Sequence, residues 1–265
     1  MTEPTEDRRG RRAALVIAHP GHELRVHGWL ERVQPDVLVL TRGDGRHGES
    51  RLLSTSRVLR ATGATPGPVY GRLADREVYA AILRSDRAKF LDLLGEVVRA
   101  LVLADVDCVV ADAEEGYNPS HDVCHYLAVA AAAAASVILR RTIEAFDFLL
   151  VGPPAECPLA LRSQARWQHL DDAALVRKLA AAAGYPEMKE EVERALVTHG
   201  GEAFRVECLR PAARDTPFRQ ERPFYETHGE RRVADGTYPC AIRFRPHLES
   251  LRATLFERAG LGAGA

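Results

Sequence analysis

The chain has 265 residues, enough to bury one full hydrophobic core and near the upper size of a single domain. Its 36 Lys and Arg residues nearly balance its 37 Asp and Glu residues, so no strong field favours nucleic acid or an anionic membrane, and we expect a small-molecule partner. With 46% apolar and 28% charged residues, the composition is that of an ordinary folded protein and excludes a disordered chain.

The first half of the sequence alternates strand and helix patterns. The continuous apolar run at 13–18 is typical of a parallel strand that is covered on both faces. This alternation predicts an α/β fold, with a Rossmann-like, mostly parallel sheet and helices on both faces. Further patterns predict strands at 37–40, 108–111 and 146–151, helices at 24–33, 50–62, 89–103 and 121–135, and Pro/Gly loops at 65–68 and 153–158.

The second half is less regular. We interpret it as a partly helical C-terminal extension of one domain that spans 13–260, with flexible ends at 1–12 and 261–265. Its patterns predict helices at 161–183, 187–197 and 243–259, and a strand at 204–209.

Cysteine spacing and hydropathy bear on the cellular compartment. The five cysteines are scattered without a C-x-x-C pair, which fits a reducing environment. The apolar run after the charged N-terminus is too short for a signal peptide, and the Ala-rich run at 128–135 is too short to span a bilayer. We therefore expect a cytoplasmic protein without a nucleic-acid or membrane partner. The sequence leaves open whether the chain forms an oligomer.

Histidines follow two of the predicted strands. Parallel sheets bind ligands at the carboxyl ends of their strands, which here are the loops after residues 18, 40 and 111. His19 and His22 follow the first of these strands, and His121 follows the third. A catalytic zinc ion takes three protein ligands, often imidazoles, and keeps a fourth position open. Because ten histidines in 265 residues also produce near pairs by chance, spacing alone does not separate a metal site from coincidence.

Three short motifs resemble those of one enzyme family. The residues AHPGHE at 18–23, directly after a strand, resemble the AHPDDE motif of the PIG-L/LmbE-like de-N-acetylases. The residues LTRGDG at 40–45 resemble that family's loop after its second strand, and NPSH at 118–121 resembles its HPDH motif, which also follows a strand and begins a helix. The matches occur in the family's order but no motif is intact, so the resemblance is to a divergent member.

The resemblance implies a Rossmann-like fold with one zinc ion that serves in the hydrolysis of an N-acyl group, commonly the acetyl group of an amino sugar. By position, His19 matches the first ligand histidine and His121 the last. His22 stands where the family has an aspartate ligand, so the implied metal site consists of three histidines. Cobalt, nickel and iron share this ligand preference, and another divalent transition metal is therefore an alternative.

Other matched positions depart from the family. Gly21 stands where the family has its general-base aspartate, and Ser120 replaces the aspartate of HPDH. Asn118 replaces the histidine that is usually assigned to stabilising the tetrahedral intermediate. An asparagine can donate a hydrogen bond to an oxyanion, but it cannot transfer a proton near neutral pH. Loss of a general acid or base typically costs ~10²–10⁴-fold in rate.

Two acids and one histidine are candidates for the missing proton transfer. Asp112 and Glu114 follow the third predicted strand and would face the same side of an extended segment. Either would act as a base, orient a ligand histidine, or remain a solvated loop charge; we favour the orienting role, because metal-bound histidines need such an acceptor. His125, one turn into the next predicted helix, is a possible fourth ligand or proton carrier, or a polar residue packed beside the site.

Charged side chains elsewhere are candidate substrate contacts. In the tail, Glu, His and Arg side chains are closely interleaved, which suits a hydroxylated or anionic substrate but equally fits an ordinary charged amphipathic helix. Arginines and an acid after the second predicted strand are similar candidates. The predicted contacts are Arg51, Arg57, Asp75, Glu226, His228 and Arg232.

Two classes of function follow from these residues. The first is a zinc-dependent hydrolase of a C–N (amide) bond, acting on an N-acyl amino sugar or a related small metabolite. The alternative is a homologue that keeps the metal and binds a sugar-like ligand without hydrolysis, or uses the pocket for other chemistry, because Gly21 lacks the catalytic carboxylate.

Overall fold

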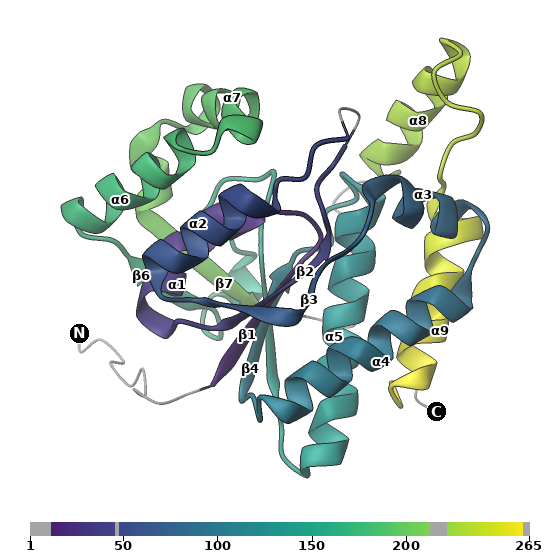
Figure 1. Cartoon of the computed structure of the whole chain (residues 1–265), viewed down its shortest axis with the longest axis horizontal. Helices are drawn as coiled ribbons and strands as arrows, with labels where there is room; N and C mark the ends of the chain where they lie inside the picture. Colours follow the sequence, from purple (N-terminus) through teal and green to yellow (C-terminus); the bar gives the residue numbers. More distant parts are fainter. Residues whose placement is uncertain (1–11, 46–47, 213–221, 262–265) are drawn as a thin grey trace.

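The computed structural model describes residues 12–45, 48–212 and 222–261. Of the predicted flexible ends, all but Arg12 and Leu261 lie outside the described residues. Figure 1 shows one central sheet with helices packed on both faces. The predicted Rossmann-like α/β fold is confirmed.

The described residues form a seven-stranded sheet of order β3-β2-β1-β4-β5-β7-β6. The first five strands of this order pair in parallel, whereas β7 is antiparallel to both β5 and β6, so the sheet is mostly parallel as predicted. The strands are β1 Ala13–Ile17, β2 Asp36–Thr41, β3 Thr65–Leu73, β4 Cys108–Asp112, β5 Glu144–Phe148, β6 Arg166–His169 and β7 Val206–Pro211.

Helices cover both faces, and each face has its own apolar core. One face carries η1 (His22–Val26), α1 (His27–Val33), α2 (Leu52–Thr62), α6 (Asp172–Ala183) and α7 (Lys189–His199). The other carries α3 (Asp75–Leu83), α4 (Arg87–Leu103), α5 (Pro119–Leu139) and α9 (Ser250–Arg258). The remaining helical segments are η2 Leu159–Leu161, η3 Pro186–Met188, η4 Gly201–Arg205, α8 Phe224–Ala234 and η5 Phe244–Glu249.

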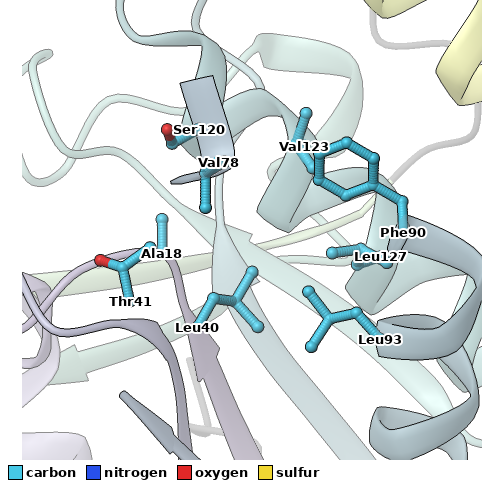
Figure 2. A pocket seen from close by; sticks show the side chains of 9 residues that line it. All are labelled: Ala18, Leu40, Thr41, Val78, Phe90, Leu93, Ser120, Val123 and Leu127. Atoms are coloured by element: carbon cyan, nitrogen blue, oxygen red, sulfur yellow. The ribbon is translucent and has the colours of Figure 1, made fainter. Parts of the chain in front are cut away.

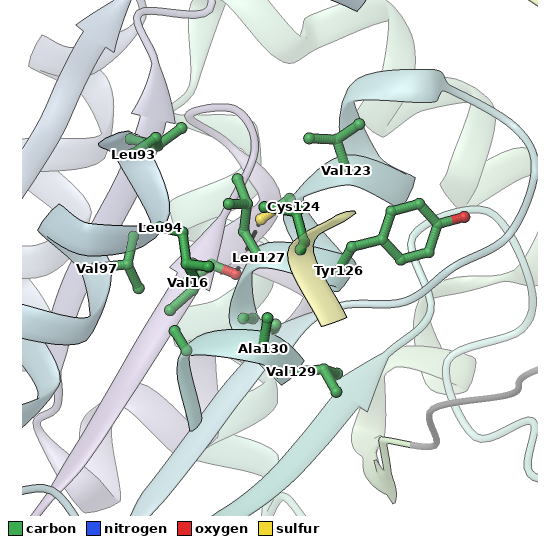
Figure 3. Packing of buried hydrophobic residues seen from close by; sticks show 14 of the residues in the cluster. Val16, Leu93, Leu94, Val97, Val123, Cys124, Tyr126, Leu127, Val129 and Ala130 are labelled. Atoms are coloured by element: carbon green, nitrogen blue, oxygen red, sulfur yellow. Dashed lines mark hydrogen bonds between the residues drawn. The ribbon is translucent and has the colours of Figure 1, made fainter. Parts of the chain in front are cut away.

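The central helix α5 packs against one face of the sheet. It begins where the Asn118 side chain accepts a hydrogen bond from the Ser120 amide, with Pro119 in the first turn. Figure 3 shows its apolar side chains packed against Val16 of β1 and against α4. By length and composition this 21-residue helix could cross a membrane, but 67% of its apolar window is buried inside the molecule, and a core helix passes the same test. The helix is longer at both ends than the predicted 121–135.

Two predictions of secondary structure are wrong, and one helix was not predicted. The predicted Pro/Gly loop at 65–68 begins β3, which is an edge strand, and proline is tolerated there because one side of an edge strand makes no ladder hydrogen bonds. The predicted helix at 161–183 divides into β6 and α6, and the short β6 pairs only with β7, far along the chain. No helix was expected where α3 lies. These elements depend on distant partners rather than on local pattern.

Candidate metal centre

The site lies at the carboxyl ends of three neighbouring strands. His19 and His22 follow β1, Thr41 ends β2 and Asp112 ends β4. The strands β2 and β4 flank β1 on opposite sides, and the connections diverge there, which opens a crevice in a parallel sheet of this kind. His121 reaches the same place from the first turn of α5.

Three imidazole rings meet in this crevice. The ring centres are 5.4 Å apart for His19 and His22, 5.2 Å for His19 and His121, and 4.5 Å for His22 and His121. All three residues are buried. The structure therefore brings together the three predicted metal ligands, although His121 is about a hundred positions from the other two.

Two acceptors hold His19. Its Nδ1 lies 2.8 Å from Thr41 Oγ1 and 3.1 Å from Asp75 Oδ1. An ionised carboxylate can only accept, so Nδ1 carries the proton and Nε2 keeps its lone pair. Burial opposes ionisation of Asp75, but the hydrogen bonds that it accepts, first from His19 and then from Thr41 and the Gly45 amide, outweigh it and lower the pKa of this carboxyl.

Asp112 holds His22 in the same way. His22 Nδ1 lies 2.9 Å from Asp112 Oδ2, which also accepts a hydrogen bond of 2.8 Å from the amide of Ala18. Asp112 is fully buried, and this burial raises its pKa to about 7. Its side chain thus occupies the orienting position that we favoured for it from the sequence.

His121 lacks such a partner. Its Nδ1 is buried and makes no hydrogen bond within the described residues. Burial, followed by the neighbouring His22 and His19, lowers the pKa of His121 well below its usual value, so the imidazole is neutral and its nitrogen lone pair is free. A buried polar atom without a partner costs free energy that a bound cation would offset.

The donor set fits a zinc ion. Zinc–nitrogen bonds of about 2.0–2.1 Å in a tetrahedral arrangement would place three imidazole centres roughly 5 Å apart, close to the spacing of these rings. Neutral imidazoles oriented by carboxylates on their second nitrogen are the usual zinc ligands. As they stand, the described residues contain no set of three His, Cys, Asp or Glu side chains already in metal-holding geometry. The rings are gathered and oriented, and His19, His22 and His121 are the residues that would hold the ion.

At Gly21 the structure disfavours a side chain. The backbone φ is +105°, a conformation that L side chains rarely adopt. A Cβ atom there would lie 3.1 Å from Met188 Cγ and Sδ. The Gly21 amide donates instead to Glu23 Oε2 at 2.7 Å, and burial raises the pKa of Glu23 to about 7. A side chain at position 21 would therefore need both a strained backbone and a shift of the Met188 side chain.

The candidate proton carriers lie around the end of β4. Glu114 is buried and accepts a 2.6 Å hydrogen bond from Tyr126, and burial raises its pKa. His125 Nδ1 lies 3.1 Å from the Asp112 carbonyl oxygen. Within the described residues, Glu114 Oε2 and His125 Nε2 are buried without a hydrogen-bond partner.

Of the predicted substrate contacts of the first half, Asp75 contacts His19, and Arg51 lies close enough to His22 to add to burial and to the charge of His19 in lowering its pKa. Arg51 Nη1 lies 2.8 Å from the Met188 sulfur, and Arg57 donates to Ser54 Oγ at 2.8 Å. Asp75 uses Oδ1 for His19 and accepts the Gly45 amide on Oδ2, so its position is that of a partner to His19.

The three candidates in the tail lie on α8. The Tyr225 amide of this helix donates a hydrogen bond to the Gly116 carbonyl oxygen, in the loop before the N-terminus of α5. Glu226 accepts hydrogen bonds from Arg222 and from the Phe244 amide. His228 stacks on the Phe224 ring, and Arg232 pairs with Asp235. The structure does not show contacts from these three side chains to the histidine cluster, and their role stays a prediction.

The sequence gives no role to three residues that the structure places here. Thr41 contacts His19, and its place at a strand end was the one available signal. Met188 lies over Gly21 and Tyr79 contacts Asn118, but both come from segments without any motif.

An apolar pocket lies beneath this site, between the sheet and helices α3, α4 and α5 (Figure 2). All of its lining residues are buried, so it belongs to the packed core rather than to the open crevice. It is lined by Ala18, Leu40, Thr41, Val78, Phe90, Leu93, Ser120, Val123 and Leu127.

No protein-family model matches the sequence, and no curated protein matches it either. Solved structures do match. The conserved protein TT1542 from Thermus thermophilus is 20% identical with a TM-score of 0.52, over 80% of this chain and 99% of that one. The A40926 pseudoaglycone deacetylase Dbv21 is 16% identical with a TM-score of 0.49, over 78% and 98% of the two chains. A deacetylase of teicoplanin biosynthesis is 16% identical with a TM-score of 0.45, over 76% and 97%. At such identities the likeness to TT1542 shows a shared fold, and the chemistry has to be argued from this chain's own residues.

Proposed function

We propose that this chain is a metal-dependent hydrolase, with zinc as the metal, that cleaves the C–N bond of an N-acyl group on an amino sugar or a related small metabolite. The observation that carries the proposal is the meeting of His19, His22 and His121 at the ends of adjacent strands. The resemblance of their motifs to those of the PIG-L/LmbE-like de-N-acetylases supports it. The proposal includes a cytoplasmic location and a small-molecule substrate.

Different residues of the crevice would bind the ion and orient its histidine ligands. The three histidines would hold the ion, which when bound would polarise a carbonyl group and supply a nucleophile from water. Asp75 and Asp112 keep His19 and His22 in the tautomer with a free Nε2. Asn118, at the start of the helix that carries His121, donates a hydrogen bond to the negative charge that develops on the substrate oxygen.

Proton transfer is assigned to Glu114, which follows β4, and to His125 of α5. Position 21 has no side chain, and Asp112 is already engaged by His22. Glu114 Oε2 and His125 Nε2 are buried and make no hydrogen bond within the described residues, so these two atoms are the ones that remain for this role. The filled space over Gly21 is the one observation that favours the alternative, a metal-retaining protein that binds without hydrolysis.

Elemental analysis of purified protein tests the metal site. We expect about one zinc ion per chain in the wild type, and its loss in both His19→Ala and His121→Ala. His169→Ala is the matched control, because His169 is an exposed histidine on β6. Absence of metal from the wild type, even after reconstitution with zinc, would contradict the proposed site.

Release of free amine then tests the reaction. Zinc-loaded protein is incubated with N-acetylglucosamine and with glucosamines that carry longer acyl groups. Amine release that is lost in His121→Ala and kept in His169→Ala is the expected result. Bound zinc without amine release from any of these substrates would support the alternative function instead.

A further inference from the structure

The orientation of the Asn118 side-chain amide follows from its hydrogen bonds. Its Oδ1 lies 2.8 Å from the backbone amide of Ser120, at the N-terminus of α5. A backbone N–H can only donate, so the atom that faces it must be the carbonyl oxygen rather than the amide nitrogen. The Asn118 side chain is thereby assigned without ambiguity.

The second contact of the same oxygen comes from Tyr79. The Tyr79 hydroxyl lies 3.1 Å from Asn118 Oδ1, and because Oδ1 can only accept, the hydroxyl must donate. Both hydrogen bonds thus fall on Oδ1. No described residue accepts a hydrogen bond from Nδ2, and this nitrogen is not among the atoms sealed from solvent. The amide presents two free donors and no free acceptor.

Helix α3 holds the site at two points. Tyr79 and Asp75 are four residues apart on α3, so they lie on the same face of this helix. Asp75 holds His19, from the loop after β1, and Tyr79 holds Asn118, from the loop after β4. One helix that no sequence motif indicated therefore fixes side chains from two separate loops.

We infer that Tyr79 is a positioning residue, which fixes the Asn118 carboxamide so that its Nδ2–H₂ group is presented as the hydrogen-bond donor of the site. Asn118 is the N-cap residue of α5 and His121 lies in the first turn of the same helix, so this donor is held at the helix start that carries the histidine. The use of the donor on a substrate oxygen rests on the proposed function, whereas the orientation itself does not. Without the Tyr79 hydroxyl the amide loses one of its two anchors and samples other rotamers.

The orientation can be observed directly, because Asn118 is the only asparagine in the sequence. Selective ¹⁵N labelling of asparagine side chains gives one NH₂ pair in a two-dimensional NMR spectrum of the full chain. We expect Tyr79→Phe to shift or broaden this pair. Tyr70→Phe is the control, because the Tyr70 hydroxyl also makes a side-chain hydrogen bond, to Ser56, but away from Asn118. An unmoved NH₂ pair in Tyr79→Phe would overturn the inference.

Kinetics on the zinc-loaded enzyme test the use of the donor. Asn118→Asp keeps an acceptor for Ser120 and Tyr79 but removes the donors, and we expect kcat to fall ~10²-fold or more. Tyr79→Phe should lower kcat about 10-fold at unchanged zinc content and nearly unchanged KM, and should have no further effect in the Asn118→Asp background. A further loss in that background would show that Tyr79 does not act through Asn118. A wild type without hydrolase activity would contradict the proposed function alone, because the NMR measurement decides the orientation independently.

Discussion

At Gly21 the backbone adopts a conformation that only glycine adopts without strain. Its φ of +105° strains any larger residue, and the close approach of Met188 means that the Met188 side chain would have to shift as well. Two hydrogen bonds to α2 hold the Met188 segment in place. The Tyr185 hydroxyl lies 2.9 Å from Thr55 Oγ1, and Glu187 Oε2 accepts from Ser54 Oγ at 2.7 Å. An aspartate placed at this position would therefore test backbone strain before it tested catalysis.

We predict that Gly21→Ala lowers the free energy of unfolding by ~2 kcal/mol or more, because backbone strain adds to the contact with Met188. Adding Met188→Ala to the Gly21→Ala variant should recover only the part of this loss that comes from the contact with Met188. Gly236→Ala is the matched control, since Gly236 also has a positive φ but no atom within 4 Å of the added Cβ. Denaturant unfolding gives the free energy of unfolding of the wild type and of these three variants. Equal losses for Gly21→Ala and Gly236→Ala would show that Met188 contributes nothing.

At the scale of elements, the buried carboxylate of Glu207 on β7 connects the N-terminus of α1 with a lysine of α6. Glu207 accepts hydrogen bonds of 2.8 Å from the amides of Gly28 and Trp29, in the first turn of α1. Lys178 of α6 lies 2.8 Å from the same carboxylate and donates to the Arg25 carbonyl oxygen at 2.7 Å. One carboxylate thus caps a helix and binds a cation from a second helix. The loop of the site, which runs into η1 and α1, is anchored through it.

We predict that Lys178→Met destabilises the fold by ~3 kcal/mol, because it leaves the Glu207 charge buried without its cation. The double variant Lys178→Met/Glu207→Gln should be less destabilised than the single variant. Lys189→Met removes an exposed pair with Glu193 and should change stability by less than about 0.5 kcal/mol. Chemical denaturation monitored by circular dichroism is the measurement, and a Lys178→Met variant as stable as Lys189→Met would refute this account of the pair.

At the scale of the whole molecule, the order of the strands assembles the site. The β2-β1-β4 arrangement sets three strand ends side by side, and α5 brings His121 across them. The crevice thus joins residues from distant parts of the chain, and Met188 covers it from the second half. An ion bound there would link these segments in the folded state and in no unfolded one.

Zinc should therefore raise the melting temperature of the intact chain. A ligand at about 100 times its Kd stabilises by about 2.7 kcal/mol, which corresponds to several degrees for a chain of this size. We expect this increase in the wild type and in His169→Ala, its reversal by a chelator, and its absence in His121→Ala. An equal increase in His121→Ala would place the bound zinc elsewhere. Differential scanning fluorimetry with and without zinc makes the comparison.

Much of the architecture could be predicted because its elements carry local signals. The buried strands β1, β2 and β4 are continuous apolar runs, and the helices between them have clear amphipathic patterns. The three ligand histidines could be proposed because they follow such strands within recognisable motifs. The edge strand β3, the short β6 and the helix α3 could not, because their stability comes from pairing and packing with distant segments.

The sequence by itself determined the fold class, the place of the site at the strand ends and the candidate ligands, since apolar periodicity and local motifs decide these. Only the tertiary structure decided the partners of the candidate residues: Asp75 for His19, Asp112 for His22 and, beside the ligands, the hydroxyl of Tyr79 for Asn118. It also decided that Met188 fills the space over Gly21. Hydrogen bonds and van der Waals contacts act over a few ångströms in space whatever the separation along the chain, and no pattern along the sequence records them.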